Sequence, residues 1–329
     1  MSDVLLDGYD AVLLDLDGTV YHGTVAVPGA VEAVRSIREH GAAVRFVTNN
    51  ASKSPDAVAG TLRDMGLPAQ ADEVRTSAQA AARLLAEHVP SGSQVLVVGA
   101  RALEDEVRAA GLTTVREMGD EVRAVVQGHS PDTAWPMLAE ACLAIRAGAL
   151  WVAANVDATL PAERGLLPGN GSMVATLRTA TDAEPLVAGK PAAPLFHAAA
   201  PESGKALVVG DRLDTDIAGA VAAGYDALVV LTGVATPATL VAAAPAERAR
   251  YLAADIGSID ATAAELTVGP QAGWTVRCQG GKLHVTAEGG SDHVALLRAL
   301  CDVAWREGVT SVLAGDEPSA TALDRLGLL

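Results

Sequence analysis

The sequence is poor in aromatic residues, in cysteine and in positive charge. Aromatic side chains make up 3% of the 329 residues, although half of the chain is apolar. A core must therefore be built from Ala, Val and Leu, and a chain of this length normally forms two or three domains. The formal net charge is −16. This charge excludes the basic face that nucleic-acid-binding proteins present, so no nucleic-acid partner is expected.

The few cysteines are also widely separated. Cys142, Cys278 and Cys301 form no Cys-x-x-Cys pair and are odd in number. We therefore expect free thiols and a reducing, cytoplasmic compartment rather than a disulfide framework. No apolar run is long enough to span a bilayer, and no basic stretch precedes an apolar one at the N-terminus. Neither a membrane span nor a signal peptide is expected.

Apolar runs alternate with helical patterns along most of the chain. The run at 11–14, the helical pattern at 29–40 and the run at 43–48 form a βαβ unit, which implies a parallel sheet with a right-handed crossover. The fold class expected is α/β with a doubly wound sheet. Residues 155–172 are rich in turn residues and lack periodicity, which predicts a long ordered loop. The Ala-rich stretch 236–250 is expected to be a helical lead-in to a linker.

The most informative motif is Asp15-Leu16-Asp17-Gly18-Thr19, directly after the run 11–14. Residues two apart in a strand share a face, so both carboxylates would leave the sheet at its carboxyl edge, where open α/β sheets bind ligands. Two carboxylates this close disfavour joint ionisation unless a cation or a shared proton separates them. The pattern favours catalysis, although a turn after a strand or a helix N-cap is the structural alternative.

Three further motifs follow apolar strands or begin helices. They are Thr48-Asn49-Asn50, Gly189-Lys190-Pro191 and Gly210-Asp211-x-x-x-Thr215-Asp216. In a doubly wound sheet such positions converge at one edge. The chemistry that they could share with the first motif is phosphoryl transfer through a covalent aspartyl-phosphate.

Each motif residue has an expected role in that chemistry. Asp15 would be the nucleophile, and Asp17 would protonate the leaving alkoxide and then activate water. Gly18 would let the backbone turn sharply and approach a phosphate. A Mg²⁺ ion, which prefers oxygen ligands, would be held by the Asp15 carboxylate, the backbone carbonyl of Asp17 and Asp211.

The remaining motif residues would act on the phosphate or around the metal ion. Thr48 would donate its hydroxyl to a phosphate oxygen, with the Asn49 amide beside it. Lys190 would supply positive charge to the developing anion. Asp216 would orient Lys190 or a metal-bound water.

The four motifs, in this order, resemble motifs I to IV of the haloacid dehalogenase (HAD) superfamily over about residues 10–256. Dehalogenases of the superfamily lack the second Asp, and P-type ATPases carry DKTGT. The resemblance therefore implies phosphoester hydrolysis or transfer, with Asp17 as the discriminating residue. A binding or regulatory protein with a degenerate site is the alternative from another class, and the intact motifs argue against it.

Residues 155–172 are similar to the cap loop of the NagD and phosphoglycolate-phosphatase branch. The matching positions are Asn155, Asp157, Pro161, Gly165, Pro168, Gly169, Gly171 and Ser172. This resemblance implies an α/β cap at about 81–184 inserted into a core formed by 1–80 and 185–257. Such a cap excludes water and selects the substrate.

Four residues of the expected cap are candidates for substrate specificity: His129, Asn155, Asp157 and Arg164. An aromatic-Asp pair is common in this branch where the present chain has Gly128-His129-Ser130, so the pocket floor differs. His129 is equally explained as a partly exposed histidine, and Arg164 as a surface ion-pair residue.

The segment 258–329 is expected to be a small α+β module, with short strands within 267–287 and helices at 292–307 and 318–326. It resembles part of a GNAT acetyltransferase fold. Its nearest match to the CoA-binding motif, Arg277-Cys-Gln-Gly280-Gly-Lys282, lies in a strand context. We therefore expect a truncated, non-catalytic module that packs on the core, forms a homodimer or binds a regulator.

The whole chain resembles the glycerol-3-phosphate phosphatases of mycobacteria. That resemblance alone implies glycerol 3-phosphate as substrate, because no spacing in the sequence indicates it. 2-Phosphoglycolate, pyridoxal phosphate and nucleotides stay open as substrates, and a phosphotransferase stays open as an activity.

Overall fold

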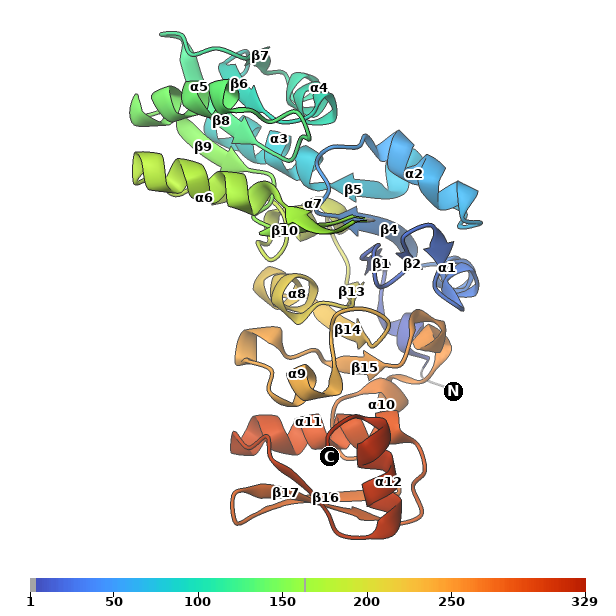
Figure 1. Ribbon diagram of the computed structural model, residues 1–329. Coiled ribbons are helices and arrows are strands. Elements are labelled where there is room, and N and C mark those ends of the chain that lie inside the picture. Colours follow the sequence, from blue (N-terminus) through green and yellow to red (C-terminus); the bar gives the residue numbers. More distant parts are fainter. Residues whose placement is uncertain (1–3, 163) are drawn as a thin grey trace. The chain divides into compact units, whose positions relative to one another are not determined.

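The computed structural model describes residues 4–162 and 164–329 (Figure 1). The chain divides into two compact units. The first unit consists of Met1–Arg45, Met65–Pro68 and Ala200–Leu329, and the second of Phe46–Asp64 and Ala69–Ala199. Among the described residues, no helix has the length and apolar character needed to cross a membrane.

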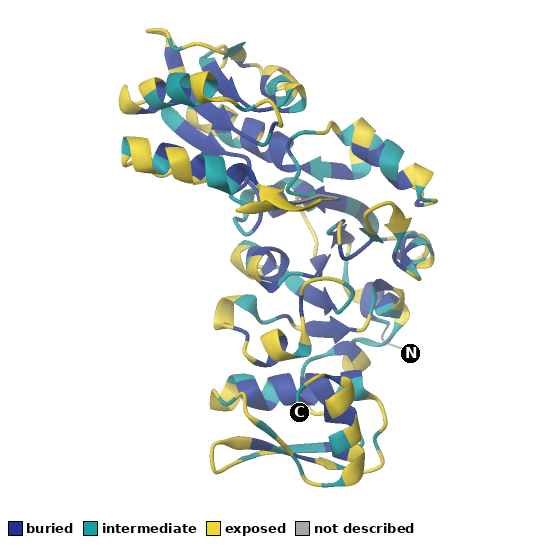
Figure 2. Ribbon diagram, viewed as in Figure 1, coloured by how far each residue is buried: buried dark blue, intermediate teal, exposed yellow. Residues whose placement is uncertain are grey.

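The first unit is built on parallel strands, most of which are buried along nearly their whole length. Their order is β15 (Tyr251–Ala253), β14 (Asp226–Val230), β13 (Ala206–Gly210), β1 (Ala11–Leu14) and then β4 (Ala43–Thr48). Figure 2 shows β13 and β14 as almost continuously buried. Continuous Val/Leu runs suit strands covered on both faces, which confirms the expected doubly wound sheet. The stretch 236–250, expected to be a helical lead-in to a linker, contains two short helical segments at 237–241 and 245–247. It is followed not by a linker but by β15, which is too short to give a recognisable apolar run.

Helices and turns complete this unit around its sheet. These elements are η1 (Leu5–Gly8), α1 (Ala30–Glu39), a π-helical turn η3 (Leu213–Ile217), α8 (Ala218–Ala223), α9 (Pro237–Val241), η4 (Pro245–Glu247), η5 (Ile256–Asp260) and the small hairpin of β2 (Tyr21–His22) and β3 (Val25–Ala26). The buried residues of α1 are Ala30, Ala33, Val34 and Ile37, a spacing that places them on one helix face.

The second unit contains a separate parallel sheet. Its strand order is β12 (Leu186–Val187), β9 (Leu150–Ala153), β8 (Val122–Gln127), β6 (Gln94–Val98) and β7 (Thr113–Val115). The helices of this unit are α2 (Pro55–Asp64), η2 (Ala71–Glu73), α3 (Ser77–His88), α4 (Arg101–Ala109), α5 (Trp135–Arg146), α6 (Asn170–Thr181) and α7 (Pro194–Ala199). The unit also contains strand β5 (Val74–Thr76) and a β-hairpin. Its core is largely aliphatic, with Phe46, Trp151 and Phe196 as buried aromatic residues, as the shortage of aromatic residues predicts.

The segment expected to be a loop, residues 155–172, contains a β-hairpin. Strands β10 (Thr159–Ala162) and β11 (Gly165–Pro168) pair antiparallel, and α6 begins at Asn170. The prediction of a loop was wrong here. The segment contains two prolines and several glycines and shows no apolar alternation, so its strands cannot be recognised from the sequence. Leu166 and Leu167 of β11 are exposed at 70% and 46%, so burial does not generate the alternation used to recognise strands.

The C-terminal module belongs to the first unit. Strands β16 (Trp274–Gln279), β17 (Lys282–Ala287) and β18 (Val312–Ala314) form a sheet. The helices of the module are α10 (Ala263–Leu266), α11 (His293–Glu307) and α12 (Glu317–Arg325).

Helix α11 of this module packs on the rest of the first unit. Arg298 Nε donates to the Leu252 carbonyl of β15 at 2.7 Å, and Trp305 Nε1 donates to the Leu240 carbonyl of α9 at 2.8 Å. Packing on the core, one of the three expected roles, is therefore observed.

Candidate active site

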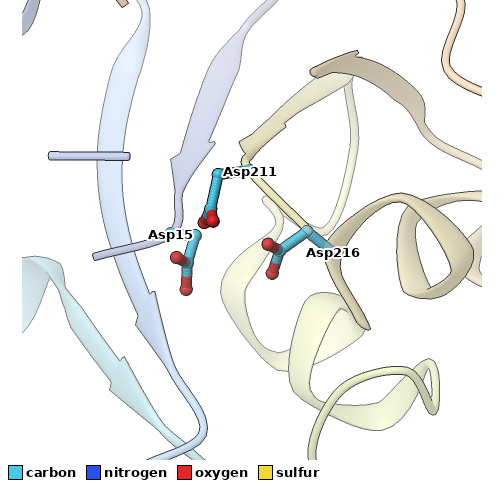
Figure 3. Close-up of side chains that lie close together, drawn as sticks. All are labelled: Asp15, Asp211 and Asp216. Atoms are coloured by element: carbon cyan, nitrogen blue, oxygen red, sulfur yellow. The ribbon is translucent and has the colours of Figure 1, made fainter. Parts of the chain in front are cut away.

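Three carboxylates of the first unit meet at the carboxyl edge of its sheet. Asp15, Asp211 and Asp216 each offer an oxygen, and these atoms lie within 4.8 Å of one another (Figure 3). Asp15 follows β1 and Asp211 follows β13, which pair in parallel with Leu14 opposite Val209. Asp216 comes from the π-helical turn after β13. The cluster thus follows from adjacent parallel strands that end at the same level.

Glycines make room for these carboxylates. Gly18 has a φ of +92°, a conformation that glycine adopts without steric cost, and its N–H donates to the Tyr21 carbonyl at 2.8 Å. A β-carbon at Gly210 would overlap the side chain of Asp216, and one at Gly233 would overlap Asp211. The backbone around the cluster can therefore be this close only with glycine at these positions.

Hydrogen bonds hold two of the carboxylates in place. Asp211 accepts from the Thr19 hydroxyl at 3.3 Å and from the Val234 N–H at 2.8 Å. Asp216 accepts from the Arg212 N–H at 3.1 Å. Asp211 and Asp216 are each 1% exposed, and like charges so close to each other and to Asp15 need a neighbouring cation to ionise together. Carboxylate oxygens are the ligands that Mg²⁺ prefers, so these residues fit a magnesium ion.

The sequence predicts Asp15, Asp211 and the backbone carbonyl of Asp17 as metal ligands, with Asp216 orienting Lys190 or a metal-bound water. The structure brings Asp216 into the cluster itself. Residue spacing does not reveal the π-helical turn Leu213–Ile217. In this turn the chain folds back, so the carboxylate of Asp216, five residues after Asp211, lies close to that of Asp211. Asp17, the expected acid and base, is exposed in the loop between β1 and β2. Its side chain is free of the crowding that surrounds Asp211.

The motifs of the second unit form a separate polar network. Lys190 is 3% exposed. Thr48 Oγ1 accepts a hydrogen bond from the Asn50 N–H at 3.1 Å. The Asn49 side chain contacts the backbone of Lys190, with Oδ1 accepting from its N–H at 2.8 Å and Nδ2 donating to its carbonyl at 3.1 Å. The two motifs that sequence analysis assigned to phosphate binding are thus joined directly.

The four candidate specificity residues fall into two groups. Asn155 is 4% exposed and donates to the Asn49 carbonyl at 2.7 Å, while Asp157 accepts from Asn49 Nδ2. His129 is partly exposed after β8, and Arg164 is exposed in the turn between β10 and β11. Asn155 and Asp157 therefore serve an internal network, and whether any of the four contacts a substrate stays a prediction.

Three family models match successive parts of the chain. A haloacid dehalogenase-like hydrolase model matches residues 12–113, and a second HAD-hydrolase-like model matches residues 187–259. A GCN5-related N-acetyltransferase-like model matches residues 271–328. The last match confirms the expected GNAT-like character of the C-terminal module.

Known relatives extend the similarity to the whole chain. D-glycerol 3-phosphate phosphatase of Mycobacterium tuberculosis is 48% identical over 98% of this chain and 95% of that protein. A crystal structure of glycerol phosphate phosphatase from the same organism, in complex with magnesium, covers 100% of both chains at 49% identity with a TM-score of 0.95. 5'-Nucleotidase YutF of Bacillus subtilis is 38% identical over 69% of this chain and 88% of that protein. The present chain therefore belongs to the haloacid dehalogenase-like hydrolases.

Proposed function

We propose that this hydrolase is a Mg²⁺-dependent phosphatase that converts glycerol 3-phosphate to glycerol and phosphate. The observation that carries the proposal is the cluster of Asp15, Asp211 and Asp216 in a chain similar to a glycerol phosphate phosphatase over its whole length. The similarity to that phosphatase extends over 98% of this chain, whereas the similarity to the nucleotidase extends over 69%. Three unpaired cysteines support a reducing, cytoplasmic location.

The proposed reaction has two steps, both carried by residues of the first motif. A carboxylate oxygen of Asp15 attacks phosphorus, the bond from phosphorus to the substrate oxygen breaks, and Asp17 gives its proton to the departing alkoxide. Water then attacks the phosphorus of the aspartyl-phosphate while Asp17 takes a proton from it. Phosphate leaves, and the Asp15 carboxylate is restored.

Asp15, Asp211 and Asp216 would hold the magnesium ion, together with the backbone carbonyl of Asp17. When bound, Mg²⁺ supplies positive charge that lets the carboxylates ionise together and offsets negative charge on the phosphoryl group. The two hydrogen bonds to Asp211 keep its oxygens in place without the ion. Phosphate binding by Gly18, Thr48, Asn49 and Lys190 remains a prediction from the sequence.

A phosphate-release screen tests the substrate. It compares glycerol 3-phosphate with 2-phosphoglycolate, pyridoxal phosphate and nucleoside monophosphates, with and without Mg²⁺. We expect the highest kcat/KM for glycerol 3-phosphate and no turnover after chelation. A higher value for another ester would move the assignment to that substrate. Transfer of the phosphoryl group to an added alcohol, without release of inorganic phosphate, would indicate a phosphotransferase.

A further inference from the structure

The Asn49 side chain holds both polar groups of one residue's backbone. Its Oδ1 accepts from the Lys190 N–H at 2.8 Å, and its Nδ2 donates to the Lys190 carbonyl at 3.1 Å. A side-chain amide that pairs with the N–H and the C=O of the same residue restrains the backbone on both sides of the α-carbon. The start of the Lys190 side chain is therefore fixed by Asn49.

Asp157 determines the orientation of the Asn49 side-chain amide, that is, which positions its nitrogen and its oxygen occupy. Both carboxylate oxygens of Asp157 are 3.2 Å from Asn49 Nδ2. An ionised carboxylate only accepts hydrogen bonds, so the amide nitrogen has to face it. If the amide were reversed, its oxygen would face the carboxylate and its nitrogen would face the Lys190 N–H. Asp157 thereby selects the one orientation that can bind the Lys190 backbone.

The surroundings of Asn49 are built to keep it there. Its backbone carbonyl accepts from the Ser77 hydroxyl at 2.6 Å and from Asn155 Nδ2 at 2.7 Å. Asn170 Nδ2 in turn donates to the Asn155 carbonyl at 2.6 Å. A β-carbon on Gly189 would lie 2.5 Å from Asn49 Oδ1. Glycine at position 189 is thus required for Asn49 to reach the neighbouring backbone.

We propose that Asn49 and Asp157 are positioning residues for Lys190, with Asp157 acting through Asn49. The inference rests on the proposed function, in which Lys190 supplies positive charge to the phosphoryl group. Charge is most effective when it is held in place before the reaction begins. A displacement of about 1 Å at such a group can lower the rate by about 100-fold. The role differs from substrate recognition, for which Asp157 would have to contact the alcohol part of the ester.

A double-mutant cycle separates the two roles. Asn49→Asp places a second carboxylate against Asp157 and removes the donor to the Lys190 carbonyl, so we expect kcat to fall by about 100-fold with KM changed much less. Adding Asp157→Asn restores a donor opposite the carboxylate, and we expect the double variant to recover about tenfold in kcat. Asp120→Asn, at an exposed position of the same unit, is the matched control. No recovery in the double variant would overturn the proposal.

The cycle is measured with glycerol 3-phosphate and with p-nitrophenyl phosphate. If Asp157 acts by positioning Lys190, the substitutions should lower kcat by the same factor for both esters. A change in the ranking of the two esters would show that Asp157 contacts the substrate and would overturn the proposal. Wild-type turnover of p-nitrophenyl phosphate without turnover of glycerol 3-phosphate would refute the proposed substrate. The double-mutant cycle could still be measured with p-nitrophenyl phosphate.

Hydrogen exchange at the Lys190 amide gives a readout that does not depend on turnover. We expect faster exchange in Asp157→Ala than in wild type, because the Asn49 amide is then free to rotate away. Unchanged exchange in a folded Asp157→Ala protein would contradict the proposal, even if the enzyme acted on neither ester.

Discussion

The carboxyl group of Asp211 occupies the space in which a side chain at position 18 would begin. A β-carbon on Gly18 would lie 2.5 Å from Asp211 Oδ2, which no real contact of a β-carbon tolerates. The φ of +92° at Gly18 independently favours glycine. The turn of the first motif and the buried carboxylate of the fourth are therefore mutually dependent, although they are far apart in the sequence.

Replacing Gly18 is expected to weaken metal binding. In Gly18→Ala the new methyl group displaces the Asp211 carboxylate, so the Mg²⁺ concentration for half-maximal activity should rise at least about tenfold, or about 1.4 kcal/mol. Magnesium titration of phosphate release measures this change. Gly8→Ala is the control, since a β-carbon there meets nothing within 4 Å. An unaltered magnesium requirement in Gly18→Ala would contradict the proposed metal site.

Removing the nucleophile should abolish turnover. We expect Asp15→Asn to lower kcat by at least about 10³-fold, which corresponds to about 4 kcal/mol of transition-state stabilisation. Single-turnover phosphate release gives the rate, and Asp7→Asn, at an exposed position of the same unit, should behave as wild type. Normal phosphatase rates in Asp15→Asn would refute the aspartyl-phosphate mechanism.

Asp214 and Asp216 provide a matched pair for the metal site. They lie two residues apart in the π-helical turn, but Asp216 is buried in the cluster whereas Asp214 is exposed and paired with Arg212 at 2.8 Å. We expect Asp216→Asn to bind Mg²⁺ more weakly and Asp214→Asn to bind it as wild type does. Calorimetric titration with Mg²⁺ distinguishes them. Equal affinity in the two variants would exclude Asp216 from the site.

Tyr9 makes stability sensitive to alkaline pH. Its hydroxyl donates to Asp226 Oδ2 at 2.7 Å and lies 3.1 Å from the Tyr251 hydroxyl, and burial followed by these hydrogen bonds raises the pKa of Tyr9 well above the usual value. A raised folded-state pKa gives stability that is complete below the unfolded pKa of about 10 and declines as pH rises above it.

Tyr9→Phe should therefore remove part of this pH dependence. We expect the variant to be less stable than wild type at pH 8, with a difference that shrinks between about pH 10 and 11. Urea denaturation at a series of pH values measures the two curves. Parallel curves over that range would show that the Tyr9 hydroxyl titrates in the same way in the folded and unfolded chains.

Arg298 ties the C-terminal module to the core sheet. It is 7% exposed, burial lowers the pKa of its guanidinium, and its Nε donates to the carbonyl of Leu252 in β15. Arg298→Met should cost about 1.5–3 kcal/mol, the range for a hydrogen bond to a charged group. A lower denaturation midpoint with an unchanged m-value would confirm it. Arg306→Met, at an exposed position on the same helix, should leave the midpoint unchanged.

Much of the core could be predicted because its strands are continuous apolar runs. Residues 11–14 and 206–209 are recognisable as buried strands, and the motifs that follow them lie at the expected sheet edge. The hairpin at Thr159–Pro168 could not be predicted, because its exposed leucines and its prolines give no alternation. β15 has three residues, and only pairing with β14 makes it a strand.

The candidate site also combines residues whose position the sequence predicts with residues whose position it does not. Asp15 and Asp211 follow from strand order, whereas the arrival of Asp216 in the cluster depends on a π-helical turn that residue spacing does not reveal. The contact between Asn49 and Asp157 joins residues 108 positions apart. Such a contact forms only in the folded second unit, so residue spacing does not reveal it.

The strand order also sets when the enzyme becomes competent during its synthesis. Thr19 and its partner Asp211 are separated by 192 positions, and β1 pairs with β13, which follows the whole second unit. The sheet of the second unit draws its strands only from residues 94–187, so it can close while β1 still lacks that neighbour, as domains generally fold during translation. A nascent chain that ends before residue 211 therefore contains Asp15 but cannot yet assemble the carboxylate cluster.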